Sequence, residues 1–118
     1  MPHLKLEVSK NIELTCYKDI FTSLQEVLFH HANVPSKNCK SRVYVASHFN
    51  VGDNETAAFV HLEIALLEGR SVEKKSLIGK NTLLLLQNHF TNECGVQITV
   101  EIRDMLSSQY FKKVQCAR

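Results

Sequence analysis

The sequence predicts an α+β fold in which a strand–helix–strand unit occurs twice, giving a four-stranded sheet with two helices on one face. The first observation is hydropathy, because segments with the two-residue period of strands flank segments with helical spacing. The second is the order of these segments, which is strand, helix, strand in both halves of the chain. The third is a similarity in letters between residues 2–9 (PHLKLEVS) and residues 58–65 (AFVHLEIA).

The first half contains two predicted strands and a helix. Residues 4–8 alternate between apolar and charged side chains, which indicates a strand. Apolar residues then recur at helical spacing over 17–31 and predict an amphipathic helix. The segment 33–37 ends this helix, because Pro35 cannot continue it. Residues 42–49 are rich in aromatic and β-branched side chains and predict the second strand.

The second half repeats this order after a turn at 51–54. Residues 57–67 are mostly apolar, which suits a strand buried on both faces. Ser71 is suited to cap the second helix. Gly95 closes the connection to a last strand, whose residues alternate over 96–102. The apolar side of the second helix is assigned to Leu77, Ile78, Leu84, Leu85 and Phe90.

The length suits a single domain, residues 1–118, with repeat halves at about 2–49 and 57–103 and a tail at 104–118. The tail has no strong period and suits a short helix or an arm that packs on a neighbour. With both helices on one face, the other face of the sheet is uncovered, and we expect many of its residues to be apolar. Such a face requires burial, so the sequence predicts a closed homo-oligomer.

Composition excludes several classes of function. A net charge of only +2 argues against nucleic acid or a membrane surface as the partner. No apolar run reaches the length of a membrane span, and the alternating N-terminus is unlike a signal peptide, so we expect a cytoplasmic protein. The four cysteines form no CxxC pair and suit reduced thiols. Neither they nor the six histidines show metal-ligand spacing, so no metal site is expected.

Pro2 is the first candidate for chemistry. Removal of Met1, which is usual before a small second residue, would leave a secondary amine at the start of a strand. An ordinary α-amino group titrates at roughly pH 7.7–8.0, and burial or nearby cations lower the pKa of an amine. Such a group suits general-base catalysis near neutral pH. Alternatively, Pro2 is merely a common second residue.

Three cations are candidates for substrate binding. Lys40 and Arg42 lie at the opening of the second strand, and Arg70 lies in the turn before the second helix. Both residue types bind carboxylates, and arginine does so with a bidentate fork. Alternatively, each is a solvated surface charge. Alternation places Lys40 and Arg42 on the same face of the strand, so spacing does not decide which of them contacts a ligand. His61 is either a proton carrier or a hydrogen-bonded core or interface residue.

Four segments together resemble the 5-carboxymethyl-2-hydroxymuconate isomerase family of the tautomerase superfamily. They are PHLKLEVSKNIE from Pro2, SRVYV at 41–45, AFVHLEI from Ala58 and EGRSVE from Glu68. The resemblance runs from residue 2 to about residue 102. It implies a tautomerase-like β-α-β repeat fold and a homotrimer with sites at subunit interfaces. It also implies that Pro2 is the catalytic base, and that Arg70 and a cation near the start of the second strand bind the substrate.

The resemblance further implies a reaction that moves a double bond in an unsaturated 2-hydroxy or 2-oxo dicarboxylate or tricarboxylate. An example is 5-carboxymethyl-2-hydroxymuconate, an intermediate of aromatic catabolism in the homoprotocatechuate pathway. No metal or organic cofactor is implied. The family tends to carry arginine where this chain has Lys40, which keeps the charge but lacks the planar fork. Two alternatives stay open: a tautomerase-fold protein without catalysis, and a ferredoxin-like protein that binds a small ligand.

Overall fold

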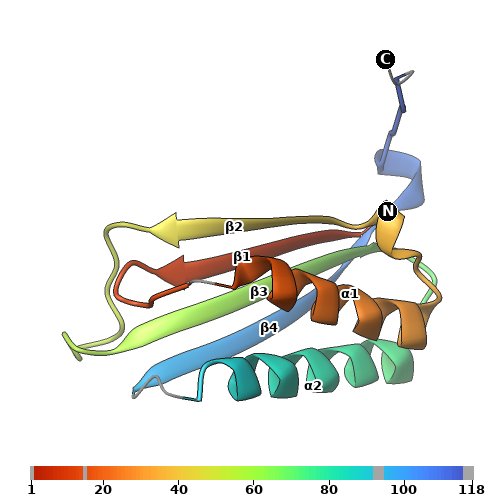
Figure 1. Cartoon of the computed structure of the whole chain (residues 1–118). Coiled ribbons are helices and arrows are strands. Elements are labelled where there is room, and N and C mark those ends of the chain that lie inside the picture. The colour runs from red at the N-terminus through yellow and green to blue at the C-terminus, as the bar shows by residue number, and fades with distance from the viewer. Residues whose placement is uncertain (1, 15, 92–94, 116–118) are drawn as a thin grey trace.

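Two helices cover one face of a four-stranded mixed sheet in the part of the chain that the computed structural model describes, residues 2–14, 16–91 and 95–115 (Figure 1). This architecture confirms the predicted α+β fold class. The elements are β1 (His3–Ser9), α1 (Tyr17–Ala32), η1 (Ser36–Asn38), β2 (Lys40–Ala46), β3 (Ala58–Leu67), α2 (Val72–His89), β4 (Val96–Met105) and η2 (Ser107–Gln109).

The strands lie in the order β2-β1-β3-β4. β1 is parallel to β2, and β3 is parallel to β4, so each helix connects two neighbouring parallel strands. The two strand–helix–strand units join through the antiparallel pair β1 and β3, in which Leu4 lies opposite Ile64. This arrangement places the beginning of β1 and the ends of β3 and β4 at the same end of the sheet.

The hydrophobic core lies between the sheet and the helices. Alternate residues of β1 and β3, such as Leu6 and Leu62, are fully buried on this side. They share one cluster with Leu24 of α1 and Ile78 of α2. Burial of one such side chain stabilises the fold by about 1.5–3 kcal/mol. The core therefore fixes the helices against the sheet and, with them, the loops at the end where β1 begins.

Two local signals position those loops. α1 ends at Asn33, whose left-handed backbone (φ 55°) closes the helix with bonds to the last carbonyl groups. α2 begins as expected, because the Ser71 side chain accepts a hydrogen bond from the backbone N–H of Lys74 at 3.1 Å. The turn before it contains Gly69 at φ 119°, a conformation that residues with a side chain rarely adopt.

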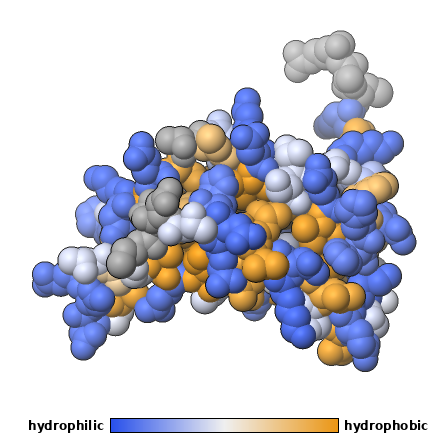
Figure 2. All heavy atoms as spheres, turned by 60° about the horizontal axis from the view of Figure 1, so that its bottom comes forward, coloured by the Kyte–Doolittle hydropathy of each residue, from blue (hydrophilic) through white to orange (hydrophobic). Residues whose placement is uncertain are grey.

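Two element assignments from the sequence are wrong in detail. The second strand spans Lys40–Ala46 and not 42–49, because its pairing with β1 stops where Ser9 meets Ala46. On α2, Leu77 and Leu84 are 50% and 55% exposed and do not face the core. Figure 2, which turns the α2 side of the molecule forward, shows apolar patches at the surface between hydrophilic residues. Ile78 is buried as predicted, Phe90 just after the helix is buried too, and Leu85 packs against the core. The other buried residues of α2 are Thr82 and Leu86.

The uncovered face of the sheet is mainly polar, which corrects the expectation of an apolar surface. Cross-strand partners share a face, and on this face Lys5 lies between Arg42 and Glu63. Glu63 in turn lies opposite Glu101. β3 is buried mainly on its helix side, and on the other side Phe59, His61 and Glu63 are half-buried and only Ala65 is buried. The mostly apolar composition of this strand concealed a two-residue alternation. We call this surface the open face.

The C-terminal segment returns to the beginning of β1. After β4, the short helix η2 lies at that end of the sheet, and the chain then runs away from the body (Figure 1). Two contacts to Glu68 attach the start of the segment, from the backbone N–H of Ser107 at 2.7 Å and from its hydroxyl at 3.0 Å. Beyond η2, Phe111 and Val114 are 86% and 76% exposed.

Candidate active site

Pro2 lies buried at the end of the sheet, immediately before β1. Its carbonyl oxygen accepts a hydrogen bond from the backbone N–H of Lys40 at 3.0 Å, which continues the parallel pairing of β1 with β2. Proline has no N–H of its own to donate within a chain, so this carbonyl bond is its backbone anchor. Met1, whose removal we expect, lies outside the described residues.

Pro2 and Arg70 line the same hollow, which has a volume of about 210 Å³. One wall comes from the connection between α1 and β2, and the other from the end of β3. Its apolar part includes Val34 and Leu66, which are buried. Pro2 therefore shares this hollow with apolar side chains and one guanidinium. The remaining lining residues are Asn33, Pro35, Asn38 and Leu67.

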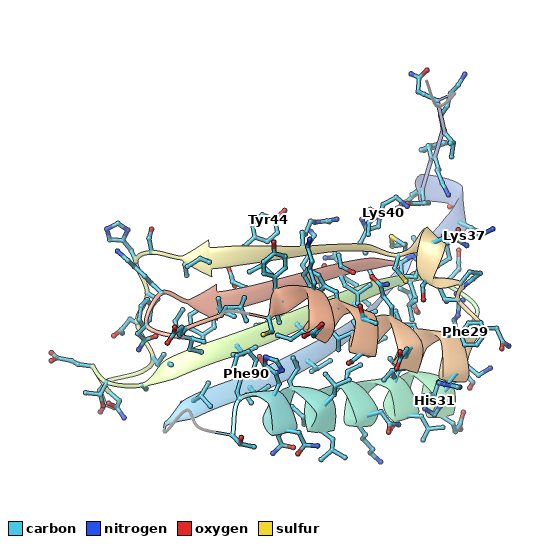
Figure 3. All side chains as sticks on the ribbon, in the orientation of Figure 1. Phe29, His31, Lys37, Lys40, Tyr44 and Phe90 are labelled. Atoms are coloured by element: carbon cyan, nitrogen blue, oxygen red, sulfur yellow. The ribbon has the colours of Figure 1, made fainter. Side chains whose placement is uncertain are left out.

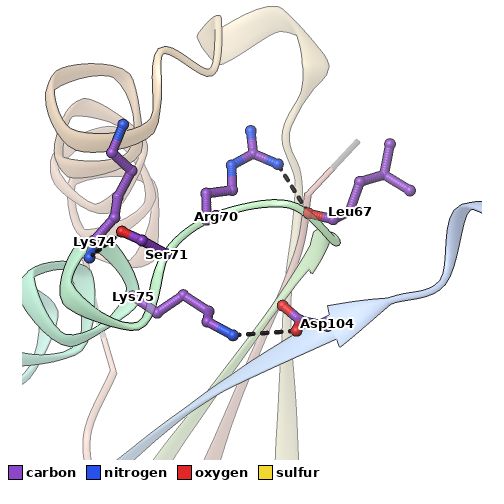
Figure 4. Close-up of polar contacts among 6 residues, drawn as sticks. All are labelled: Leu67, Arg70, Ser71, Lys74, Lys75 and Asp104. Carbon is purple, nitrogen blue, oxygen red and sulfur yellow. Dashed lines mark hydrogen bonds and ion pairs between the residues drawn. The ribbon is translucent and has the colours of Figure 1, made fainter.

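Arg70 is held by backbone carbonyl groups. One terminal nitrogen donates to the Leu67 carbonyl at 3.0 Å, which is the contact drawn in Figure 4. The other terminal nitrogen donates to the Ala32 carbonyl at 3.4 Å. None of the ion pairs among the described residues includes Arg70. A guanidinium has five N–H donors, so several remain for a ligand. Arg70 is a fixed positive charge that lacks a carboxylate partner in this part of the structure.

Lys40 and Arg42 both belong to the open face, as alternation predicted, but they differ in surroundings. Lys40 is exposed near the beginning of β2, and its Nζ donates to the Asn38 carbonyl at 3.4 Å (Figure 3). Arg42 lines a separate hollow of about 520 Å³, which also contains Lys5 and Glu63. The structure therefore brings Pro2 and Arg70 together in one hollow and places Arg42 in the second. Lys40 lines neither of these two hollows.

Sequence reasoning missed His3 and Tyr110. Nδ1 of His3 lies 3.1 Å from a terminal nitrogen of Arg42, and Nε2 lies 3.0 Å from the Tyr110 hydroxyl. The pKa of His3 is lowered from 6.5, first by burial and then by the positive charges of Arg42 and Lys40. His3 follows Pro2 directly in the sequence, so its position next to a candidate base could have identified it as a site residue. Tyr110 lies 107 residues away from His3 in the chain, and no motif marks it.

His61 is remote from Pro2 along the sheet. It pairs with Glu7 near the other end of β1, and its Nδ1 lies 2.6 Å from the Thr99 hydroxyl. Within residues 2–14, 16–91 and 95–115, no three His, Cys, Asp or Glu side chains are grouped to hold a metal ion. Two of the cysteines, Cys94 and Cys116, lie outside these ranges. None of the helices described has the length and apolar character needed to cross a membrane.

Comparison with known structures confirms the fold. A 5-carboxymethyl-2-hydroxymuconate isomerase from Deinococcus radiodurans R1 is 27% identical, with a TM-score of 0.85 over 97% of this chain and 90% of that chain. A second structure, described as 5-carboxymethyl-2-hydroxymuconate delta-isomerase, is 17% identical, with a TM-score of 0.78 over 98% and 89%. A third, described as "Q0 fused 4-OT wild type symmetric trimer", has a TM-score of 0.73 at 17% identity over 90% and 87%.

Comparison of the sequence with models of protein families shows which family the chain belongs to. No curated protein sequence matches the chain. The model for 5-carboxymethyl-2-hydroxymuconate isomerase, in contrast, matches residues 2–117, nearly the whole chain. This match confirms the resemblance seen in the sequence motifs and supports an isomerase of the tautomerase type. The chain belongs to the 5-carboxymethyl-2-hydroxymuconate isomerase family and has the fold of the tautomerase superfamily.

Proposed function

We propose that this protein is an isomerase that moves a double bond in an unsaturated 2-hydroxy or 2-oxo carboxylate such as 5-carboxymethyl-2-hydroxymuconate. One observation carries the proposal: Pro2 and Arg70 line one hollow, and Arg70 has no carboxylate partner among the described residues. This arrangement suits a base beside a bound carboxylate. Family membership supports the reaction class.

In the proposed mechanism, Pro2 acts after Met1 has been removed. Buried apolar surroundings and the charge of Arg70 disfavour the protonated amine, so the nitrogen is available as a base. It takes the proton from the substrate 2-hydroxyl, and the electron pair forms the 2-oxo group as the double bond shifts. Pro2 then returns the proton to a carbon further along the conjugated chain. Arg70 binds a carboxylate and stabilises the negative charge of the dienolate.

We further propose a homotrimer whose sites lie at subunit interfaces. The Pro2 hollow and the Arg42 hollow share no lining residue, so a single chain does not combine all the proposed site residues. The open face carries both acidic and basic side chains, which suits contact with another copy. A relative of similar fold is described as a symmetric trimer. In this assembly, Arg42 or Lys40 of one copy supplements Pro2 and Arg70 of another.

The decisive assay follows isomerisation of 5-carboxymethyl-2-hydroxymuconate by ultraviolet absorbance, with protein whose intact mass shows loss of Met1. We expect turnover, and its loss in protein that keeps a residue before Pro2, because an amide nitrogen is not a base. Lys18→Ala on the outer side of α1 is the control and should leave turnover unchanged. No turnover by correctly processed protein contradicts the assignment and favours a ligand-binding protein without catalysis.

Shared sites are tested separately by mixing subunits. Protein with a blocked Pro2 and protein carrying Arg42→Ala are unfolded together and refolded. If each site uses Pro2 of one copy and Arg42 of another, about a quarter of the sites regain both residues. Recovered activity well above that of either variant alone supports the trimer proposal. Activity no greater than the average of the two variants contradicts it.

A further inference from the structure

The connection between α1 and β2 forms one wall of the Pro2 hollow and is bonded to Pro2 itself. The backbone N–H of Lys40, at the end of this connection, donates to the Pro2 carbonyl at 3.0 Å. Two residues earlier, the backbone N–H of Asn38 donates to the Pro35 carbonyl at 2.9 Å and closes the short helix η1. Asn38 lines the hollow, so the fold holds this residue in the same hollow as the proposed base.

The side-chain amide of Asn38 has no partner in the described fold. Two asparagines line the hollow, but Asn33 has a left-handed backbone (φ 55°), which asparagine tolerates better than most residues and which explains its place at the end of α1. Asn38 is half-buried and has no such backbone. Within residues 2–14, 16–91 and 95–115, its backbone carbonyl accepts from Lys40 Nζ, whereas no hydrogen bond includes its side-chain amide. The amide is therefore available to a ligand in the hollow.

The proposed reaction develops negative charge on the oxygen at the 2-position, from which Pro2 removes the hydroxyl proton. Of the described residues that line the hollow, Arg70 alone is charged, and the proposed function assigns it to a carboxylate. Its two terminal nitrogens already donate to the carbonyls of Leu67 and Ala32. A neutral donor in the same hollow stabilises the developing charge without competing with the carboxylate for Arg70. A carboxamide N–H is such a donor.

We propose that the Asn38 carboxamide donates a hydrogen bond to the oxygen at the 2-position of the substrate and selects acids that carry an oxygen there. The proposal rests on the proposed function, because Pro2 and Arg70 bring that oxygen into the hollow. In the starting acid, the 2-hydroxyl itself donates to Pro2, whereas in the dienolate the same oxygen is charged and only accepts. The bond to Asn38 is therefore stronger in the dienolate, and it accelerates the reaction more than it tightens binding.

The kinetic test compares Asn38→Ala with Asn88→Ala, the matched control on the exposed side of α2. We expect Asn38→Ala to lower kcat for 5-carboxymethyl-2-hydroxymuconate about 10- to 100-fold and to leave KM within about twofold, because the amide acts on the dienolate. Asn38→Asp keeps the shape and adds a negative charge, which favours the protonated Pro2 amine. The acidic limb of the kcat/KM profile should therefore move about one pH unit upward. A kcat of Asn38→Ala within about twofold of the wild type, an equal loss in Asn88→Ala, or an unmoved limb in Asn38→Asp overturns the proposal.

A second test needs no turnover. Calorimetry compares the Kd values of 2-oxoglutarate and glutarate, two probes that differ only in the oxygen at the 2-position. The wild type should bind 2-oxoglutarate about fivefold more tightly, the effect of one neutral hydrogen bond, and Asn38→Ala should lose this preference. If the preference depends on Asn38 but the muconate is not isomerised, the proposed function fails and the role of Asn38 stands. Equal binding of both probes by the wild type, or a preference kept in Asn38→Ala and lost in Asn33→Gly, overturns the proposal.

Discussion

Replacing Arg70 by glutamine is expected to reduce kcat/KM by about 10- to 150-fold. The guanidinium is already held by the carbonyl groups of Leu67 and Ala32, so it requires little ordering when a carboxylate binds. A hydrogen bond to a charged group contributes about 1.5–3 kcal/mol, which corresponds to that range of rates. Arg70→Lys keeps the charge but not the fork and should lose less activity than Arg70→Gln.

The assay for Arg70 compares kcat/KM for 5-carboxymethyl-2-hydroxymuconate with the Tm of each variant. Lys74→Gln is the matched control, because it removes the same charge near the start of α2 from a residue outside the Pro2 hollow. Arg70→Gln within about twofold of the wild type would refute a role in binding. So would an equal loss in Lys74→Gln, since that result would indicate general electrostatics and not a positioned guanidinium.

Three further predictions concern stability. Ser9→Ala should lower the free energy of unfolding by about 1–3 kcal/mol in urea titrations, because the buried hydroxyl accepts from the Phe59 N–H at 3.0 Å and its loss leaves that donor unpaired. Leu62→Ala should cost about 2–5 kcal/mol, since it opens a cavity in the core, and a smaller change would indicate local collapse. The third concerns His3, whose pKa in the folded protein lies below 6.5, the ordinary value that applies to the unfolded chain. At a pH between the folded and the unfolded pKa, the unfolded chain therefore binds more protons than the folded protein. The Tm should therefore fall as the pH drops through about 6.5 and less so in His3→Asn, and equal falls in both proteins would contradict the assignment.

The fold was largely predictable because its signals are local. Alternation identified β1, and Ser71 marked the start of α2 by the chemistry of its hydroxyl. The errors in assigning buried faces arose in segments with many apolar residues, where the strand or helix period of hydropathy could not be recognised. On α2, Ile78 and Leu86 lie eight residues apart and share the buried side, whereas Leu84 falls on another side of the same apolar run. Composition alone does not distinguish these sides.

The candidate site was predictable only in part, because its contacts are long-range. Pro2 and Arg70 were each chosen for their chemistry, and only the fold shows that they line one hollow. The contact between His3 and Tyr110 joins the two ends of the described chain. It depends on where β4 ends and how η2 turns back, and no spacing in the sequence encodes that geometry.

Alternation along β1 and β2 explains why the proposed site needs more than one part of the fold. Pro2 and His3 are successive residues, so the first contributes to the hollow near the helices and the second to the open face. Arg42 lies on the open face like His3, because it pairs with Lys5, which is two residues after His3 on β1. A compact ligand in the Pro2 hollow therefore contacts Arg70 but not Arg42 of the same chain. An acid with carboxylates at both ends can contact both cations in two ways: it extends around the end of the sheet, or it lies between two copies of the chain. Recovery of activity in mixed subunits would favour the second arrangement, because only that one combines Pro2 and Arg42 from different copies.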